Sequence, residues 1–167
     1  SDTAFALGVE FAPLEAHTIA EIDRHLDAGL KPENPLDIWG SRERFEERFE
    51  ACLLALAQDP NVAVTAFITN YRDGYFLSEA IYRVVENAIA KTGKLIILST
   101  CYSDLANAAM CRRAYDAGIQ LIDGTRETLL AIRHLFAWRD FRQRPAVPPS
   151  LPVNDAEVVE RWRLQLA

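Results

Sequence analysis

Small polar side chains, an arginine and a glycine follow one apolar segment of the chain within six residues. The segment Thr69-Asn70-Tyr71-Arg72-Asp73-Gly74 lies between a predicted strand and a predicted helix. The N–H groups at a helix start carry partial positive charge, and a guanidinium beside them is suited to an anion. These residues therefore predict contact with a phosphate or an acyl carboxylate. The alternative is that Arg72 and Asp73 pair with each other at the surface.

Two other stretches are predicted to lie at the same edge of a sheet. The first contains Asn34, which precedes a proline, and Asp37, which is near a helix start. The second follows a strand and contains Thr100 and Ser103. Ligands of an open parallel sheet bind beyond the carboxyl ends of its strands. We therefore expect these four residues to form supporting loops, although a rigid turn with a helix cap also explains the first stretch.

The chain has no residue pattern that is typical of a catalytic centre or a metal site. Cys101 follows a predicted strand, but no histidine is near it in sequence to act as its base. His17, His25 and His134 are not clustered, and we expect structural or surface roles for them. The three cysteines form no CxxC pair, so neither a disulfide framework nor a zinc site is predicted. We assign no catalytic residue and no metal ligand.

Short apolar segments alternate with amphipathic segments through the middle of the chain, as in a doubly wound parallel sheet. The predicted strands are 62–69, 94–100 and 119–123, and the predicted helices are 42–57, 75–91, 103–117 and 125–138. Each helix has an apolar stripe that can pack on a sheet. The sequence therefore predicts an α/β fold with a mostly parallel sheet.

The two ends of the chain have weaker patterns. Residues 8–14 could form a short edge strand, and residues 15–26 a surface helix. Residues 144–152 include four prolines, which remove backbone donors, so this stretch is predicted to be a linker. After it, Asn154 or Asp155 can cap a last helix, whose apolar side needs a partner.

Composition and charge argue against several classes of protein. Half of the 167 residues are hydrophobic, which is enough for one α/β domain with a core. The net charge is -6 with both signs mixed along the chain, which argues against a nucleic-acid partner. The most strongly apolar run, residues 95–98, is too short to span a membrane, and no leader precedes Ser1. We therefore expect a cytoplasmic protein with no membrane partner.

The order of these features resembles that of a known enzyme family. The motif Pro32-Glu33-Asn34-Pro35-Leu36-Asp37 is followed by a helix that ends near residues 55–62, then by a strand and the loop 70–74. This order resembles the acyl-CoA ligases that form ADP or GDP. The closest pieces are the C-terminal domain of the succinyl-CoA ligase β subunit and its counterpart in single-chain acetate-CoA ligases. The resemblance continues through Ala117-Gly118-Ile119 and covers roughly residues 8–141.

The resemblance implies a three-layer α/β/α flavodoxin-like (succinyl-CoA ligase-like) domain over residues 1–141. Residues 142–167 would be a proline-rich linker and a helix leading to an ATP-grasp domain, so we expect the full-length protein to continue. Such an enzyme uses ATP or GTP, Mg and CoA to convert a carboxylic acid into acyl-CoA, releasing a nucleoside diphosphate and phosphate. The expected partners are a small carboxylic acid and the CoA-binding, phosphohistidine-bearing and ATP-grasp domains or subunits.

In that family, the corresponding domain presents a helix N-terminus to the phosphohistidine, and the loop before the helix helps to hold the acid. By position, the resemblance implies phosphate or acyl contacts for Thr69, Asn70, Tyr71, Arg72 and Gly74. Helix N-termini stabilise negative charge as it moves, so this contribution is positioning and electrostatics. The chain alone is expected to bind no cofactor and to be inactive.

Two departures from the family pattern affect these expectations. The succinyl enzymes have adjacent glycines where Thr69 and Asn70 stand, so the acid pocket is expected to differ in shape. The family domain usually opens with a strand and a glycine-rich turn, and neither precedes Ser1. We therefore expect either a trimmed amino end or a sheet that lacks its first strand.

Two other functions fit the same residues. Bacterial protein acetyltransferases carry ligase-like domains that sense metabolites without ligase chemistry, and a phosphorylatable histidine in the full-length protein would distinguish the ligase from the sensor. A receiver or flavodoxin domain would need an acidic cluster or flavin-binding loops, which are missing here.

The ligase hypothesis predicts that the loop 69–74 faces solvent near the turn 34–40. Aromatic side chains at this end should form a surface for another domain or for a homodimer. The candidates are Trp39, Tyr71, Tyr75 and Tyr102.

Overall fold

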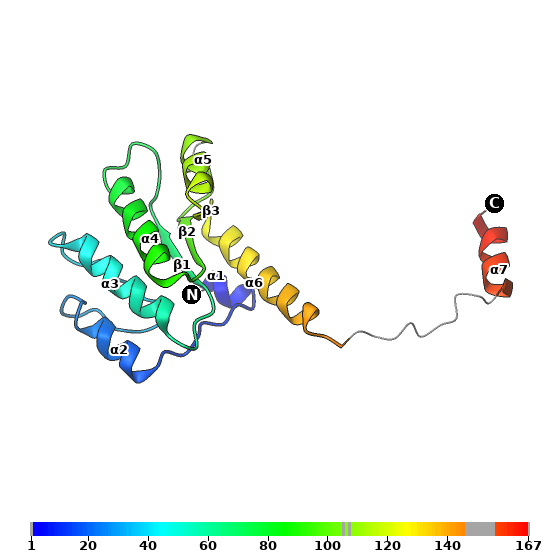
Figure 1. Cartoon of the computed structure of the whole chain (residues 1–167), viewed down its shortest axis with the longest axis horizontal. Helices are drawn as coiled ribbons and strands as arrows, with labels where there is room; N and C mark the ends of the chain where they lie inside the picture. The colour runs from blue at the N-terminus through cyan, green and yellow to red at the C-terminus, as the bar shows by residue number, and fades with distance from the viewer. Residues whose placement is uncertain (1, 105, 107, 146–155, 167) are drawn as a thin grey trace. The chain divides into compact units, whose positions relative to one another are not determined.

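The computed structural model of the chain describes residues 2–104, 106, 108–145 and 156–166. These residues form seven helices and three strands (Figure 1). In chain order they are α1 (Asp2–Ala6), α2 (Ala16–Asp23), α3 (Phe45–Gln58), β1 (Thr65–Thr69), α4 (Ser78–Thr92), β2 (Ile96–Thr100), α5 (Ala108–Asp116), β3 (Gln120–Ile122), α6 (Thr125–Arg142) and α7 (Ala156–Leu166).

The chain divides into two units, Ser1–Leu135 and Phe136–Ala167. The first unit contains the sheet, and the second contains the end of α6 and α7. The domain boundary expected at residue 141 falls inside α6 and stays a prediction.

The three strands form a parallel, open sheet in the order β1-β2-β3. Thr65 of β1 is in register with Ile96 of β2, and Ile97 of β2 with Gln120 of β3. Parallel neighbours need a crossover connection, which α4 and α5 supply. The architecture is the expected α/β fold, consistent with a flavodoxin-like three-layer α/β/α arrangement.

Side chains of β2 alternate between the two faces of the sheet, and all five of its residues are buried. Ile96 and Leu98 belong to the core cluster that α3 and α4 complete. Ser99 faces the other layer, where its hydroxyl lies 2.7 Å from that of Thr128 on α6. Figure 1 shows α3 and α4 on one side of the strands and the start of α6 on the other.

The pattern of apolar residues explains how α4 packs on the sheet. Ile81, Val84, Val85 and Ala88 recur at helical spacing, and all four are at most 2% exposed. Each large apolar side chain buried in this way contributes roughly 1.5–3 kcal/mol. The helix ends at Gly93, whose φ of 62° is left-handed backbone that favours glycine. The packing of this apolar stripe on the sheet fixes the position of α4, including its first turn, which follows the β1–α4 loop.

The helices α3, α4 and α5 begin later than the sequence predicts, and local backbone geometry explains these differences. Before α3, Arg44 has a φ of 50°, which is left-handed backbone. Before α4, Gly74 has a φ of 67° and the Ser78 N–H bonds the Tyr75 carbonyl, so residues 72–77 form turns. Before α5, Asp104 has a φ of 64°, which is incompatible with a helix. The loops after β1 and β2 are therefore longer than expected.

The edge strand predicted at residues 8–14 is wrong, because this segment forms no strand. Its carbonyl groups are bonded by side chains instead. The Asn34 amide donates to the Ala12 carbonyl (3.0 Å), and the Asn61 amide donates to the Pro13 carbonyl (3.1 Å). Pro13 also lacks the N–H that a strand ladder uses. The predicted surface helix at 15–26 is present as the shorter α2.

A buried carboxylate joins the start of α2 to the end of α3. Asp59 is 0% exposed and accepts hydrogen bonds from the Glu15 N–H (2.9 Å) and the Asn61 N–H (2.8 Å). Burial alone would raise the pKa of Asp59, but these bonds and one from Thr18 hold the pKa below its usual value. Asp59 therefore stabilises the turn that leads into β1.

The second unit carries exposed aromatic and apolar side chains. Trp138 and Phe141, near the end of α6, stack with ring centroids 5.8 Å apart. On α7, Val159 and Trp162 are exposed. The predicted caps of this last helix, Asn154 and Asp155, and most of the predicted linker lie outside the described residues. Among the described residues, no helix combines the length and the apolar character needed to cross a membrane.

Candidate functional site

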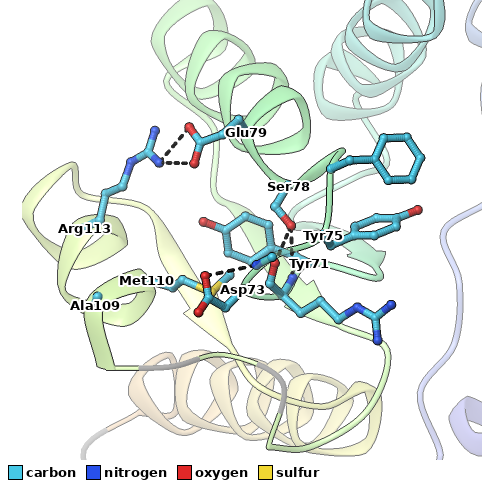
Figure 2. Close-up of a pocket in the computed structure, with 11 residues that line it drawn as sticks. Tyr71, Asp73, Tyr75, Ser78, Glu79, Ala109, Met110 and Arg113 are labelled. Atoms are coloured by element: carbon cyan, nitrogen blue, oxygen red, sulfur yellow. Dashed lines mark hydrogen bonds and ion pairs between the residues drawn. The ribbon is translucent and has the colours of Figure 1, made fainter.

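An open pocket of approximately 460 Å³ lies beyond the carboxyl end of β1 (Figure 2). The β1–α4 loop and the first turn of α4 form one wall, and α5 forms the opposite wall. Its lining residues are Tyr71, Arg72, Asp73, Gly74, Tyr75, Phe76, Ser78, Glu79, Ala109, Met110 and Arg113. The pocket is therefore at the sheet edge where the sequence predicts a ligand.

Reciprocal hydrogen bonds hold the β1–α4 loop against the start of α4. The Ser78 hydroxyl donates to the Arg72 carbonyl (2.7 Å), and the Arg72 N–H donates to Ser78 Oγ (3.2 Å). The Asp73 carboxylate accepts the Gly74 N–H (3.0 Å). No side chain caps α4, since its N-cap residue is Leu77. The helix start therefore keeps the partial positive charge of its first N–H groups.

Arg72 is exposed at the rim of the pocket together with Asp73 and Gly74. Its guanidinium lies 5.4 Å from the centre of the Tyr75 ring, a cation–π geometry. Within the part of the chain that the structure describes, Arg72 makes no ion pair with Asp73, so the alternative of a mutual surface pair is not found. The Arg72 side chain remains accessible to an anion.

Tyr71 differs from the prediction that it forms part of an exposed aromatic surface. It is only 2% exposed, and its ring stacks on Tyr82 of α4 with centroids 6.5 Å apart. Burial raises the pKa of Tyr71, and the positive charge of Arg113 counteracts part of that rise. Trp39 and Tyr102 are exposed as expected, at 47% and 74%, and Tyr75 is half-buried.

An ion pair between α4 and α5 crosses one side of the pocket. Arg113 Nη1 donates to both carboxylate oxygens of Glu79, at 2.6 and 2.8 Å. The hydrogen bond from Arg113 is the main reason that the pKa of Glu79 lies below its usual value. The Arg113 guanidinium also lies 3.9 Å from the centre of the Tyr82 ring. Sequence reasoning missed this pair because its two members are 34 positions apart.

Four other lining residues are not predicted from the sequence. Ser78 belongs to the predicted helix, and only its backbone contacts to Arg72 assign it to the loop. Phe76 is 65% exposed, which its residue type does not indicate. Ala109 and Met110 come from α5, whose placement depends on the order of the strands.

The structure does not bring Thr69, Asn70, Thr100 or Ser103 into the lining of this pocket. The Thr69 carbonyl accepts the Cys101 N–H (2.9 Å), as part of the sheet. Thr100 is fully buried, and its hydroxyl accepts the Gly124 N–H (2.7 Å). The Ser103 hydroxyl lies 3.4 Å from the Glu127 carboxylate. The contacts predicted for these residues stay predictions, and Thr100 has its polar partners within the protein.

The 34–40 turn contributes mainly structural contacts. Asn34, which is joined to Pro35 by a cis bond, holds the Ala12 carbonyl, and Asp37 accepts the Trp39 N–H (3.0 Å). Neither caps α3, whose N-cap residue is Arg44. The segment after this turn contacts one lining residue, since the Arg42 guanidinium lies 4.7 Å from the centre of the Phe76 ring.

The described residues contain no activated nucleophile and no cluster that could hold a metal. Burial raises the pKa of Cys101, which is the opposite of what a thiolate nucleophile needs. His25 lies 3.1 Å from Glu21 on α2, and His134 is exposed on α6. In the same residues, no group of three His, Cys, Asp or Glu side chains is placed to bind a metal ion.

Comparison with known proteins finds similarity among solved structures. No family model matches the sequence, and no curated protein matches it. Among solved structures, the chain is similar to PH0766 from Pyrococcus horikoshii OT3, with a TM-score of 0.61 and 21% sequence identity. The likeness covers 77% of this chain and 30% of the PH0766 chain. The two share a fold. This chain thus corresponds to less than a third of the length of PH0766.

Proposed function

We propose that this chain is the acyl-CoA ligase domain of a synthetase that forms acyl-CoA and a nucleoside diphosphate. The observation that carries the proposal is the open pocket at the carboxyl end of β1. There, the uncapped start of α4 and the exposed Arg72 supply positive charge around a space of approximately 460 Å³. This arrangement suits a carboxylate or a phosphoryl group.

Two further observations support the proposal. The features that resemble the NDP-forming ligases occur in the family's order, and the loop that would hold the acid by that resemblance provides Tyr71, Arg72 and Gly74 to the pocket. The fold shared with PH0766 covers 77% of this chain but 30% of the PH0766 chain, as expected if this chain is a module of a larger protein.

The chain's own residues would act by positioning and by electrostatics. Ser78 fixes the loop through its two bonds to the Arg72 backbone, so the guanidinium starts from a defined position. The N–H groups at the start of α4 then stabilise negative charge on a group that enters the pocket. Phe76 and Tyr75, beside the opening, offer apolar surface to another domain.

The remaining chemistry is assigned to other parts of the full-length protein. The described residues bring no metal-binding cluster together, so Mg and the nucleotide are proposed to bind elsewhere, as are CoA and the phosphohistidine. With no activated nucleophile among those residues, this domain is proposed to be inactive alone.

The experiment that tests the proposal measures nucleoside diphosphate release by the full-length protein with CoA and a panel of carboxylic acids. Arg72→Ala removes the accessible guanidinium and should lower acid-dependent turnover at least tenfold. Arg83→Ala is the matched control, because Arg83 lies on α4, the helix that follows the Arg72 loop, but pairs with Glu46 outside the pocket. Asn70→Ala tests one of the two loop residues, Thr69 and Asn70, that the resemblance implies but the pocket lining omits.

The possible outcomes separate the ligase from the metabolite sensor. Turnover that Arg72→Ala weakens and Arg83→Ala leaves unchanged would support the ligase with its acyl end at this pocket. Binding of an acid or acyl-CoA without turnover would favour the sensor. Equal losses in both arginine variants would refute the placement of the site.

A further inference from the structure

Tyr71 places a hydroxyl group at the inner wall of the pocket. Its side chain is almost completely enclosed, at 2% exposure, yet it lines the pocket. No hydrogen bond from its hydroxyl to another described residue is found, and none of the fully buried side-chain N and O atoms of these residues lacks a partner, so the hydroxyl is accessible to solvent from the pocket. Figure 2 shows the Tyr71 ring directed toward the side of the pocket where Glu79 and Arg113 meet. This hydroxyl is therefore an unused donor at the wall of the pocket.

The Arg113–Glu79 pair already has the form of an arginine that binds a carboxylate. Glu79 places both oxygens on one nitrogen of Arg113, Nη1. In the described residues, Nε and Nη2 of Arg113 make no hydrogen bond, so the guanidinium retains donors for a second partner. Its position over the Tyr82 ring, at 3.9 Å, holds the guanidinium plane independently of Glu79.

Both side chains of this pair are exposed to solvent, 45% for Arg113 and 65% for Glu79. Exposed pairs contribute little free energy, so a competing carboxylate can displace Glu79 at small cost. Glu79 also lies in the first turn of α4, where its negative charge occupies the field of the helix start. An incoming anion would therefore compete with Glu79 both for the Arg113 guanidinium and for the N–H groups at the start of α4.

We propose that Arg113 and the Tyr71 hydroxyl form the binding site for the carboxylate of a small organic acid, and that the Glu79 side chain occupies this site when it is empty. The inference rests on the proposed function for the identity of the pocket and deepens it by naming the binding groups. In the bound state, the acid's carboxylate accepts hydrogen bonds from Arg113 and from Tyr71. The body of the acid lies against Ala109 and Met110 on the α5 wall.

The test is a titration of the isotope-labelled chain with sodium acetate at constant ionic strength, followed by NMR shifts of the pocket amides. Glu79→Gln removes the competing charge and should tighten acetate binding about three- to fivefold. Adding Tyr71→Phe keeps the ring and its stacking but removes the hydroxyl, and should weaken binding about tenfold. Adding Arg113→Gln should abolish it.

The matched control is Glu46→Gln, which breaks the similar exposed pair between Glu46 and Arg83 outside the pocket. It should leave acetate binding at the wild-type level. An equal gain in Glu46→Gln and Glu79→Gln would overturn the inference, as would an unchanged affinity after Tyr71→Phe. A parallel titration with inorganic phosphate tests the ligand class, since a larger gain for phosphate than for acetate would refute a carboxylate site.

This experiment and the turnover assay can fail separately. Tighter acetate binding by Glu79→Gln in a protein that makes no acyl-CoA would support this carboxylate site and refute the ligase function. Acyl-CoA formation together with equal acetate binding in all variants would support the ligase function and refute this carboxylate site.

Discussion

Replacing Asp59 tests whether one buried carboxylate joins α2 to the end of α3. Asp59 is 0% exposed and accepts N–H groups from Glu15 at 2.9 Å and Asn61 at 2.8 Å, with a further bond from the Thr18 side chain. Asp59→Ala removes the acceptor that the Glu15 and Asn61 N–H groups share. Asp59→Asn keeps the shape but exchanges one acceptor oxygen for a donor group.

The magnitude follows from the number and type of these bonds. A hydrogen bond to a charged group contributes roughly 1.5–3 kcal/mol, and bonds that share one side chain are not additive. We therefore expect the free energy of unfolding to fall by about 3 kcal/mol in Asp59→Ala and by roughly half as much in Asp59→Asn. Both losses should be visible as a lower urea midpoint with an unchanged slope.

The pH dependence gives a second readout with a definite sign. Because the pKa of Asp59 is lower in the folded chain, its stabilisation is complete above the unfolded-state pKa of about 3.9 and is lost as the pH falls through the folded-state pKa. Wild type and Asp59→Asn should therefore converge in stability only below about pH 4. The control is Asp37→Ala, an exposed carboxylate with one backbone N–H partner, which should cost much less. Equal stability of wild type and Asp59→Ala at neutral pH would refute the reasoning.

Two other predictions concern a glycine and the cysteines. Gly124 has a φ of 106° and an added Cβ would lie 2.3 Å from Glu127 Oε2, so Gly124→Ala should lower the free energy of unfolding by about 2 kcal/mol in urea denaturation. Gly29→Ala, with a φ of 96° and open space around it, isolates the backbone part of that cost, and no loss in either variant would contradict the prediction. Burial raises the pKa of Cys52 to about 11, so a thiol reagent at mildly alkaline pH should label exposed Cys111 quickly and Cys52 only after unfolding. Equal labelling rates in the folded chain would show that Cys52 is accessible.

The fold was predictable where a single element carries its own pattern. The apolar stripe through Ile81, Val84 and Val85 identified α4, and the apolar run of β2 identified a strand that is buried on both faces. Both patterns depend only on the repeat of a helix or a strand, so they are visible without knowing the tertiary structure. The parallel pairing of the strands followed from their alternation with helices.

The amino-terminal segment was not predictable in the same way. Residues 8–14 have the composition of a strand, but their carbonyl groups are bonded by the side chains of Asn34 and Asn61, which are distant in sequence. These long-range partners provide the hydrogen bonds that a strand would have obtained from a neighbour. Local pattern therefore indicated an element that tertiary contacts replaced.

The candidate site was predictable in part. The loop residues Arg72 and Gly74 were identified from their position between a strand and a helix, and both line the pocket. The opposite wall of the pocket was not predictable, because Arg113 contacts Glu79 only once β2 has placed α5 beside α4. Tyr71 lines the pocket, but its prediction as a surface residue is wrong, since its orientation depends on stacking with Tyr82.

The central claim is that this chain belongs to a protein that makes acyl-CoA, and direct detection of that product tests it best. The full-length protein would be incubated with ATP or GTP, Mg, CoA and a panel of carboxylic acids, and acyl-CoA would be measured by mass spectrometry. The account predicts acyl-CoA and nucleoside diphosphate in equal amounts for at least one acid, with both reduced together in Arg72→Ala. Absence of acyl-CoA with every acid would contradict it, even if the pocket binds one of them.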